Sequence, residues 1–287
     1  MSRYDVAIIG SGPAAISAAL TLWALKKNIL WLGSATLSEK IRMAERIRNY
    51  PGLSDVTGAQ MQEAFLTQIE AMGLSITPKT VTGVYDMGGY FGILCDQESF
   101  EATAVILATG VESIKPIPGE LEFLGRGVSY CATCDGFLYE DKSIAVVCTS
   151  ADYEHEVAYL AGLAERVYLI PLYRDVTVTG DNITVVKGMP RRIEGERKAS
   201  RLLFDKETLA VDGIFFLKAA ISPSALVGGL ATEDGHVVVD RHGATNLAGL
   251  FAAGDCTGRP YQYVKAAGEG NVAAHAAVDY LNQIQKS

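Results

Sequence analysis

The sequence predicts an α/β fold made of two dinucleotide-binding, Rossmann-like domains, the second inserted into the first. Three observations support this fold class. A strand, a Gly-rich turn and a helix open the chain, a second strand–helix–strand pattern begins near residue 143, and a Gly-Asp motif followed by a long helix stands near the C-terminus. Strands that alternate with helices form parallel sheets. We therefore expect residues 1–113 and 242–287 to form the first domain and residues 114–241 to form the inserted one.

The opening segment has the pattern of a dinucleotide-binding unit. Tyr4–Ile9 predicts a buried strand, Ala14–Lys26 a helix rich in Ala and Leu, and Asn28–Leu32 a second strand. Residues 10–15 between the first strand and the helix read Gly-Ser-Gly-Pro-Ala-Ala. In this G-x-G-x-x-A pattern the glycines let the backbone approach a pyrophosphate, which the helix N-terminus then stabilises. A glycine turn that binds nothing is the alternative, and the strand–turn–helix context favours the binding site.

The other elements of the first domain follow from periodicity and turn residues. Gly58–Gly73 shows helical periodicity, whereas Val81–Asp96 alternates and is interrupted by glycines, as in a small antiparallel meander. Ala104–Gly110 is a strand that ends in Ala-Thr-Gly. Gly249–Gly254 and a helix from about Val264 to Ile284 close the chain.

The inserted domain begins after a Pro-containing linker, Ile114–Gly119. A new strand–helix–strand pattern follows at Ser143–Cys148, Tyr153–Ala164 and Arg166–Ile170. Short strands then continue to about residue 221. Internal repeats and low-complexity tracts are absent from the sequence.

A pair of cysteines precedes that pattern. Cys131 and Cys134 stand in the run Tyr-Cys-Ala-Thr-Cys-Asp-Gly, with Asp135 directly after the second cysteine. Each sulfur of a Cys-x-x-Cys pair can stabilise the other's thiolate and close a small disulfide ring, and a neighbouring carboxyl group can move the proton. The motif therefore predicts a redox-active dithiol rather than two core cysteines that happen to be three apart. The remaining cysteines have no such context, and we expect them to be buried apolar side chains: Cys95, Cys148 and Cys256.

Composition limits the function further. The chain has 287 residues, of which 49% are hydrophobic and 20% are charged, and its net charge is −8. An acidic protein is a poor match for nucleic acid or for anionic lipid. No apolar run reaches the roughly 18 residues of a membrane span, and residues 1–5 lead into a strand without a signal-peptide pattern, so we expect a cytoplasmic protein. No second cysteine pair or histidine cluster completes a four-ligand metal site.

Three short motifs, together with the turn at residues 10–15, resemble a known family. Asn49–Gly52, Ala108–Gly110 and Ala252–Asp255 recur in this order in flavoproteins with two dinucleotide folds. With the cysteine motif, they make the whole chain similar to the low-molecular-weight thioredoxin reductases. The resemblance implies FAD as cofactor, thioredoxin as electron acceptor, a homodimer, and a domain rotation that alternately exposes the dithiol to flavin and to thioredoxin.

The resemblance also implies roles for individual residues. Cys134 would be the sulfur next to the flavin, Cys131 the sulfur that attacks thioredoxin, and Asp135 the acid/base. Asp255 would orient the ribityl-phosphate part of FAD. The residues expected to contact FAD are Gly10, Ser11, Gly12, Pro13, Ala14, Gly33, Ser34, Lys40, Asn49, Val81, Ala108, Thr109, Gly110, Gly254, Asp255, Gln262 and Tyr263.

The second nucleotide site departs from the family pattern. NADPH-using members carry a glycine turn after the first strand of the inserted domain and an Arg-rich run after its second strand. Here residues 148–153 read Cys-Thr-Ser-Ala-Asp-Tyr, and residues 170–174 read Ile-Pro-Leu-Tyr-Arg. Side chains replace the glycines, and Asp152 and Glu154 place negative charge where a phosphate would bind. The sequence therefore predicts that NADPH is not the electron donor.

The branch of the family that shows these losses uses ferredoxin. Pro260–Tyr263 and Lys265–Gly270 resemble that branch, and Lys40 stands where NADPH-using relatives have Gly-Gly-Gln. Because ferredoxins are generally acidic, we expect a local basic docking patch. Two clusters qualify, and we favour the first because its sequence neighbours bind flavin. The first cluster is Lys40, Arg42, Arg46 and Arg48, and the second is Lys187, Arg191, Arg192, Arg197, Lys198 and Arg201. For either, an ordinary solvated charged face is the alternative.

Three other functions remain open from the sequence. The chain could be an NADPH thioredoxin reductase with a divergent pocket, a disulfide oxidoreductase with a second flavin in the vacated site, or a non-enzymatic FAD-binding module. The cysteine pair followed by Asp135 argues against the last of these.

Overall fold

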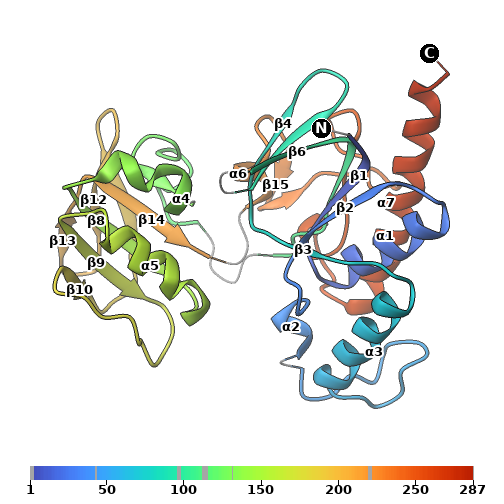
Figure 1. Ribbon diagram of the computed structural model, residues 1–287, viewed down its shortest axis with the longest axis horizontal. Helices are drawn as coiled ribbons and strands as arrows, with labels where there is room; N and C mark the ends of the chain where they lie inside the picture. The colour runs from blue at the N-terminus through green and yellow to red at the C-terminus, as the bar shows by residue number, and fades with distance from the viewer. Residues whose placement is uncertain are drawn as a thin grey trace. The chain divides into compact units, whose positions relative to one another are not determined.

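The chain folds into two compact units in the computed structural model (Figure 1). The described residues are 3–42, 44–95, 98–111, 116–130, 132–218 and 222–286. Unit 1 comprises Met1–Val111 with Ser222–Ser287, and unit 2 comprises Glu112–Ile221. Both contain parallel strands and helices, together with some antiparallel strands, so the predicted α/β class is confirmed.

Unit 1 is organised around one sheet in the order β3-β2-β1-β6-β5-β4, with β17 also pairing with β6. Its strands are β1 (Tyr4–Ile9), β2 (Ile29–Gly33), β3 (Thr77–Pro78), β4 (Val81–Asp86), β5 (Phe91–Cys95), β6 (Glu98–Leu107) and β17 (Leu250–Ala252). β6 pairs antiparallel with β5 over its first half and parallel with β17 over its last residues. Ile9, Leu107 and Ala252 lie in register. The segments that follow β1, β6 and β17 therefore emerge together at one edge of the sheet.

Helices cover this sheet. They are α1 (Pro13–Ala24), α2 (Glu39–Arg42), α3 (Gly58–Ala71), α6 (Pro223–Leu226) and α7 (Tyr263–Ile284), with the 3-10 turn η3 (Asp255–Thr257). α1 and α7 lie side by side (Figure 1). Small buried side chains, such as Ala15 and Ala18 on α1 and Ala273 and Ala277 on α7, allow this close packing. No helix in the described part of the chain is both long and apolar enough to cross a membrane.

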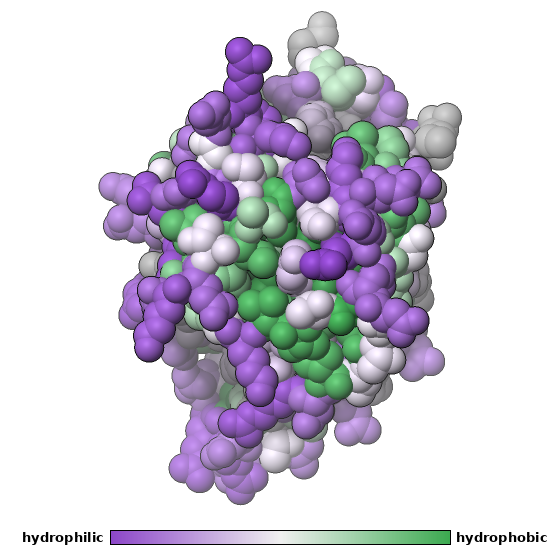
Figure 2. All heavy atoms as spheres, turned by 90° about the vertical axis from the view of Figure 1, so that its left-hand side faces the viewer, coloured by the Kyte–Doolittle hydropathy of each residue, from purple (hydrophilic) through white to green (hydrophobic). Residues whose placement is uncertain are grey.

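Unit 2 contains a five-stranded parallel sheet in the order β10-β9-β8-β14-β7 and an antiparallel sheet β11-β12-β13. The parallel strands are β7 (Val128–Ser129), β8 (Ser143–Cys148), β9 (Arg166–Pro171), β10 (Ile183–Val185) and β14 (Gly213–Leu217). The antiparallel strands are β11 (Arg192–Gly195), β12 (Ala199–Leu203) and β13 (Thr208–Ala210). The helical segments are α4 (Ala132–Asp135), η1 (Gly136–Tyr139), η2 (Ala151–Tyr153) and α5 (Glu154–Ala161). Figure 2 shows an apolar area bordered by hydrophilic side chains on the side of this unit.

The second boundary between the units differs from the expected one. We expected the inserted domain to end at residue 241, whereas residues 222–241 belong to unit 1. This segment contains α6 and the hairpin β15 (Thr232–Glu233) and β16 (His236–Val237), and Val227 bridges to Val84 in β4. Such short elements carry too little periodicity to be assigned to a domain from sequence.

Candidate functional site

The turn after β1 is shaped by the strand beside it. Gly10 adopts φ +133°, and a Cβ at this position would lie 2.1 Å from the carbonyl oxygen of Ala108. Only glycine therefore lets the ends of β1 and β6 approach this closely. The indole Nε1 of Trp31 donates a hydrogen bond of 2.8 Å to the Gly10 carbonyl oxygen and anchors the turn to β2.

The N-terminus of α1 is free of side-chain caps. Gly12 is the N-cap residue and Pro13 is the first helical residue. Apart from its neighbours in the chain, no atom of the described residues lies within 4 Å of the point where a Gly12 Cβ would stand. The amide groups of the first helical turn therefore face open space with a favourable helix dipole, which is the arrangement that binds a phosphate.

The loop that follows β17 contains Asp255 and lies at the same end of the sheet as the segments that follow β1 and β6. The Gly254 amide donates a hydrogen bond of 2.9 Å to Glu269 Oε2 on α7. Lys265 Nζ donates to the carbonyl oxygens of Gly254 and Gly258 at 2.9 and 2.8 Å and pairs with Glu269 at 3.0 Å. The predicted FAD residues did not include Lys265 and Glu269. Their signal in the sequence is a charged pair four residues apart on an otherwise Ala-rich helix.

Asp255 lies in the loop that this pair holds. Burial raises the pKa of the Asp255 carboxyl, and the ammonium groups of Lys265 and Lys40 partly oppose this effect. The side chains of Lys40 and Lys265 thus contribute positive charge to the surroundings of Asp255.

A second group of predicted residues lies around Lys40. Lys40 Nζ donates a hydrogen bond to the Val111 carbonyl oxygen, and the Tyr263 hydroxyl donates to the Lys40 carbonyl oxygen at 3.0 Å. Asn49 Nδ2 donates to Gln262 Oε1 at 2.7 Å. Residues far apart in the sequence are therefore joined by direct hydrogen bonds at the start of α7.

Thr109 presents a buried hydroxyl oxygen with no hydrogen-bond partner in the described part of the chain, although the thiol of Cys256 is close to it. Buried polar atoms are rarely left without a partner, and a thiol is only a weak one, so this hydroxyl has capacity for a hydrogen bond with a ligand. With the open space at Gly12 and the uncapped helix α1, it shows that these residues fit a bound dinucleotide such as FAD.

Gly33, Ser34 and Val81 are further predicted FAD residues, and of these Gly33 touches the turn after β1. A Cβ at Gly33 would lie 2.9 Å from the Gly10 carbonyl oxygen, so the end of β2 touches the turn. Ser34 Oγ is hydrogen-bonded to Thr36 Oγ1. Val81 begins β4, which β5 separates from β6.

The redox motif belongs to unit 2. Cys131 and the side chain of Cys134 lie outside the described residues, so the predicted pairing of the two sulfurs stays a prediction. Asp135 ends α4, and its Oδ2 atom accepts a hydrogen bond of 2.6 Å from Ser129 Oγ. Ser129 ends β7, so the strand holds the carboxyl group in place.

Side chains of unit 2 form hydrogen bonds in the turn after β8 and at the helix that follows it. Ser150 Oγ accepts from the Asp152 amide at 3.2 Å. Glu154, the first residue of α5 and 9% exposed, accepts from the Tyr173 hydroxyl at 2.7 Å and from the Thr177 amide at 2.9 Å. Burial opposes ionisation, but the hydrogen bonds from Thr177 and Tyr173 keep the pKa of the Glu154 carboxyl below its usual value.

This network connects two departures from the nucleotide-binding pattern. Glu154 places the chain's own negative charge at the N-terminus of α5, and Tyr173, from the segment that lacks the Arg run, donates to it. The carboxylate is thus bonded to the segment that stands in place of the Arg run and not to the first amides of α5. Negative charge in the first turn of α5 therefore disfavours a second anion, such as a pyrophosphate, at this end of the helix.

The cysteines outside the motif are buried, as predicted. Burial raises the pKa of the Cys148 and Cys256 thiols to about 11, so both are protonated at neutral pH. Protonated buried thiols are poor nucleophiles. Among the described residues no group of three or more His, Cys, Asp or Glu side chains could hold a metal ion.

Comparison with known proteins agrees with these features. Residues 4–172 and 173–270 match the pyridine nucleotide-disulphide oxidoreductase family. A thioredoxin reductase of Treponema pallidum (strain Nichols) is 32% identical, with 98% of each chain covered. The chain therefore belongs to the pyridine nucleotide-disulphide oxidoreductases, and within them to the thioredoxin reductases. It is a flavoprotein disulfide reductase of this type.

Solved structures extend the comparison. A ferredoxin-flavin thioredoxin reductase from Clostridium acetobutylicum is 44% identical, covers 100% of both chains and superposes with a TM-score of 0.93. A thioredoxin reductase from Gloeobacter violaceus is 28% identical with a TM-score of 0.81, and the match covers 98% of this chain and 95% of that one. The predicted resemblance to the ferredoxin-dependent branch is confirmed at the level of the fold and of sequence identity.

Proposed function

We propose that this enzyme passes electrons from reduced ferredoxin through FAD and the Cys131/Cys134 disulfide to thioredoxin, without NADPH. The observation that carries the proposal is the Glu154 network, in which a carboxylate in the first turn of α5 is bonded to Tyr173 and Thr177 in the segment that lacks the Arg run. The identity to a ferredoxin-flavin thioredoxin reductase supports it. Cytoplasmic location belongs to the proposal as well, and homodimeric assembly, also part of it, rests on the family resemblance.

In this proposal unit 1 binds FAD. The turn at Gly10–Ala14 and the helix α1 hold the pyrophosphate, Asp255 accepts hydrogen bonds from the ribityl part, and the buried Thr109 hydroxyl gains a partner. When bound, FAD accepts electrons singly and delivers them as a pair. Lys265 and Glu269 keep the Asp255 loop in position for this contact.

The two glycines of the turn should respond differently to substitution. Gly10→Ala should destabilise the protein by about 2–4 kcal/mol, because its Cβ would overlap the Ala108 carbonyl oxygen at a positive φ. Gly12→Ala should fold normally but bind FAD at least about tenfold more weakly, because its Cβ would enter only the space left for the pyrophosphate. Thermal unfolding with and without added FAD separates the two effects. Normal FAD affinity in Gly12→Ala would place the pyrophosphate elsewhere.

On the acceptor side, Cys131 attacks the thioredoxin disulfide and Asp135 moves the accompanying proton. Ser129 holds the Asp135 carboxyl for this transfer. The overall direction is favourable, because a ferredoxin near −400 mV lies about 130 mV below thioredoxin near −270 mV, which is roughly 6 kcal/mol for two electrons.

We propose that ferredoxin docks on the first basic cluster. The guanidinium groups of Arg46 and Arg48 share one carboxylate, Asp55, at 3.4 and 2.9 Å. Their side chains are 55% and 74% exposed. The four cations of the cluster stand against Glu39, Glu45 and Asp55, which leaves one net positive charge. Lys40 from the same cluster lies close to Asp255. Steering toward this surface would bring an acidic donor to the FAD-binding unit.

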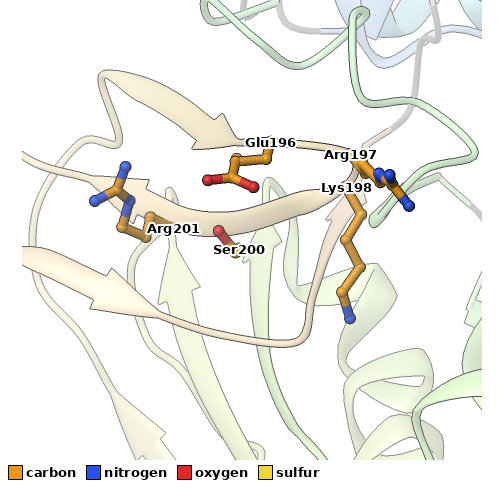
Figure 3. A pocket seen from close by; sticks show the side chains of 6 residues that line it. Glu196, Arg197, Lys198, Ser200 and Arg201 are labelled. Carbon is orange, nitrogen blue, oxygen red and sulfur yellow. The ribbon is translucent and has the colours of Figure 1, made fainter.

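The second basic cluster supplies a matched comparison. Arg191 pairs with Asp205, and Arg201 pairs with Glu194. Arg197 and Lys198, at the β11–β12 turn shown in Figure 3, are exposed and form no ion pair among the described residues. Both clusters therefore contain two accessible cations with which charge reversal can be compared.

Reversing Arg46 and Arg48 to Glu should lower the ferredoxin association rate about tenfold or more at low salt and flatten its salt dependence, because surface charges act through steering over a Debye length of roughly 10 Å. Stopped-flow reduction of the flavin by ferredoxin measures this rate. Thioredoxin reduction by chemically reduced enzyme should be unchanged. If Arg197→Glu with Lys198→Glu carries the whole effect instead, ferredoxin binds at unit 2 and the proposed docking surface is wrong.

A further inference from the structure

A buried ion pair lies inside unit 2. Lys218 Nζ stands 2.6 Å from Glu120 Oε1, and the two side chains are only 6% and 2% exposed. The second carboxylate oxygen of Glu120 accepts a hydrogen bond of 3.0 Å from the Ile117 amide. Both charges are thus compensated inside the fold, as buried charges must be.

The same carboxylate holds Tyr130. The Tyr130 hydroxyl donates a hydrogen bond of 2.6 Å to Glu120 Oε1. The Lys218 ammonium lies 4.7 Å from the centre of the Tyr130 ring, and Phe216 packs edge-on against that ring at 6.3 Å. The phenol is therefore fixed at its hydroxyl by an anion and at its face by a cation.

This network holds a tyrosine that is adjacent in the chain to the cysteine motif. Tyr130 directly precedes Cys131, and Ser129 before it donates to Asp135, the residue after Cys134. Side-chain hydrogen bonds therefore hold the backbone on both sides of the cysteine motif. The partners Glu120 and Lys218 come from the first and last parts of unit 2, so the network is a long-range feature of the fold.

We propose that Glu120 and Lys218, acting through Tyr130, are positioning residues that set the dithiol–disulfide equilibrium of Cys131 and Cys134. Holding the residues that flank the motif reduces the conformational freedom that the open dithiol would gain, and so favours the closed ring over the open dithiol. This inference rests on the proposed redox role of the pair. It requires neither ferredoxin nor thioredoxin.

The test is equilibration of the complete flavoprotein with glutathione. In this exchange two glutathione thiols are oxidised to one glutathione disulfide while the Cys131–Cys134 disulfide is reduced to two thiols. Acid quenching, alkylation and mass spectrometry give the ratio of dithiol to disulfide. Tyr130→Phe, which keeps the ring and removes only the hydroxyl, should shift this ratio toward the dithiol by about three- to tenfold, where tenfold corresponds to about 30 mV.

Further variants separate positioning from general stability. Glu120→Gln with Lys218→Met removes both charges together, and avoids leaving one buried charge unpaired. It should shift the equilibrium in the same direction as Tyr130→Phe. Arg191→Met breaks the exposed pair with Asp205 in the same unit and should leave the equilibrium unchanged.

The outcomes are distinct. If Tyr130→Phe is folded and its glutathione equilibrium equals that of the unaltered protein, the inference is wrong. The same conclusion follows if Arg191→Met shifts the equilibrium as much as Tyr130→Phe. If the unaltered protein forms no Cys131–Cys134 disulfide at all, the proposed function falls together with this inference.

Discussion

Cys131→Ser and Cys134→Ser should each abolish thioredoxin reduction, to less than about one thousandth of the original rate, while FAD remains bound. The disulfide cannot form without both sulfurs. FAD retention is expected because the dinucleotide turn and its supporting residues lie in unit 1, whereas the motif lies in unit 2. Turnover of thioredoxin with reduced ferredoxin, measured beside the flavin absorbance of each variant, tests both parts.

The two serine variants also distinguish the sulfurs. If Cys134 faces the flavin, Cys131→Ser should show a thiolate–flavin charge-transfer band while the flavin is oxidised, and Cys134→Ser should lack it. Cys148→Ala is a suitable control, because this thiol lies in the same unit, is buried, and has a pKa raised by burial to about 11. It should keep normal turnover. Thioredoxin reduction by Cys131→Ser would show that the attacking thiol is assigned incorrectly.

Asp135→Asn should lower the rate of thioredoxin reduction by about 10²- to 10⁴-fold, the range that one acid/base group contributes. Asparagine keeps the shape of the side chain and can still bond to Ser129, so the loss would report proton transfer rather than folding. Single-turnover reduction of thioredoxin by reduced enzyme measures the step directly.

Ser129→Ala provides the comparison for this variant. It removes the 2.6 Å hydrogen bond but leaves the carboxyl group, so it should slow the reaction only by about tenfold or less. An Asp135→Asn enzyme with a normal rate would remove Asp135 from the proton pathway, whatever Ser129→Ala does.

Much of unit 1 could be predicted from the sequence because its signals are local. The β1–turn–α1 segment has its glycines, its proline and its apolar runs in consecutive positions. The strand ends at Leu107 and Ala252 were recognisable as short motifs, and parallel pairing with β1 then brings them to one edge. The bounds of the predicted elements differ from the observed ones by a few residues, since helix and strand ends depend on tertiary contacts.

Long-range pairs could not be predicted in the same way. The loss of glycines after β8 was visible, but the contacts that stabilise Glu154 come from Tyr173 and Thr177, on a segment with no regular periodicity. The Glu120–Lys218 pair joins residues 98 positions apart. Nothing near either residue indicates its partner, because a buried charge is recognised only once the fold brings its counter-ion to it.

Anaerobic flavin spectroscopy tests the central claim, that electrons come from ferredoxin and not from NADPH. The oxidised holoprotein is mixed with stoichiometric NADPH in one cell and with reduced ferredoxin in another, and the flavin absorbance is followed. The account predicts that NADPH leaves the spectrum unchanged, because Glu154 and Asp152 place negative charge at the N-terminal end of α5, and that ferredoxin bleaches the flavin. Rapid bleaching by NADPH, or no bleaching by ferredoxin, would contradict it.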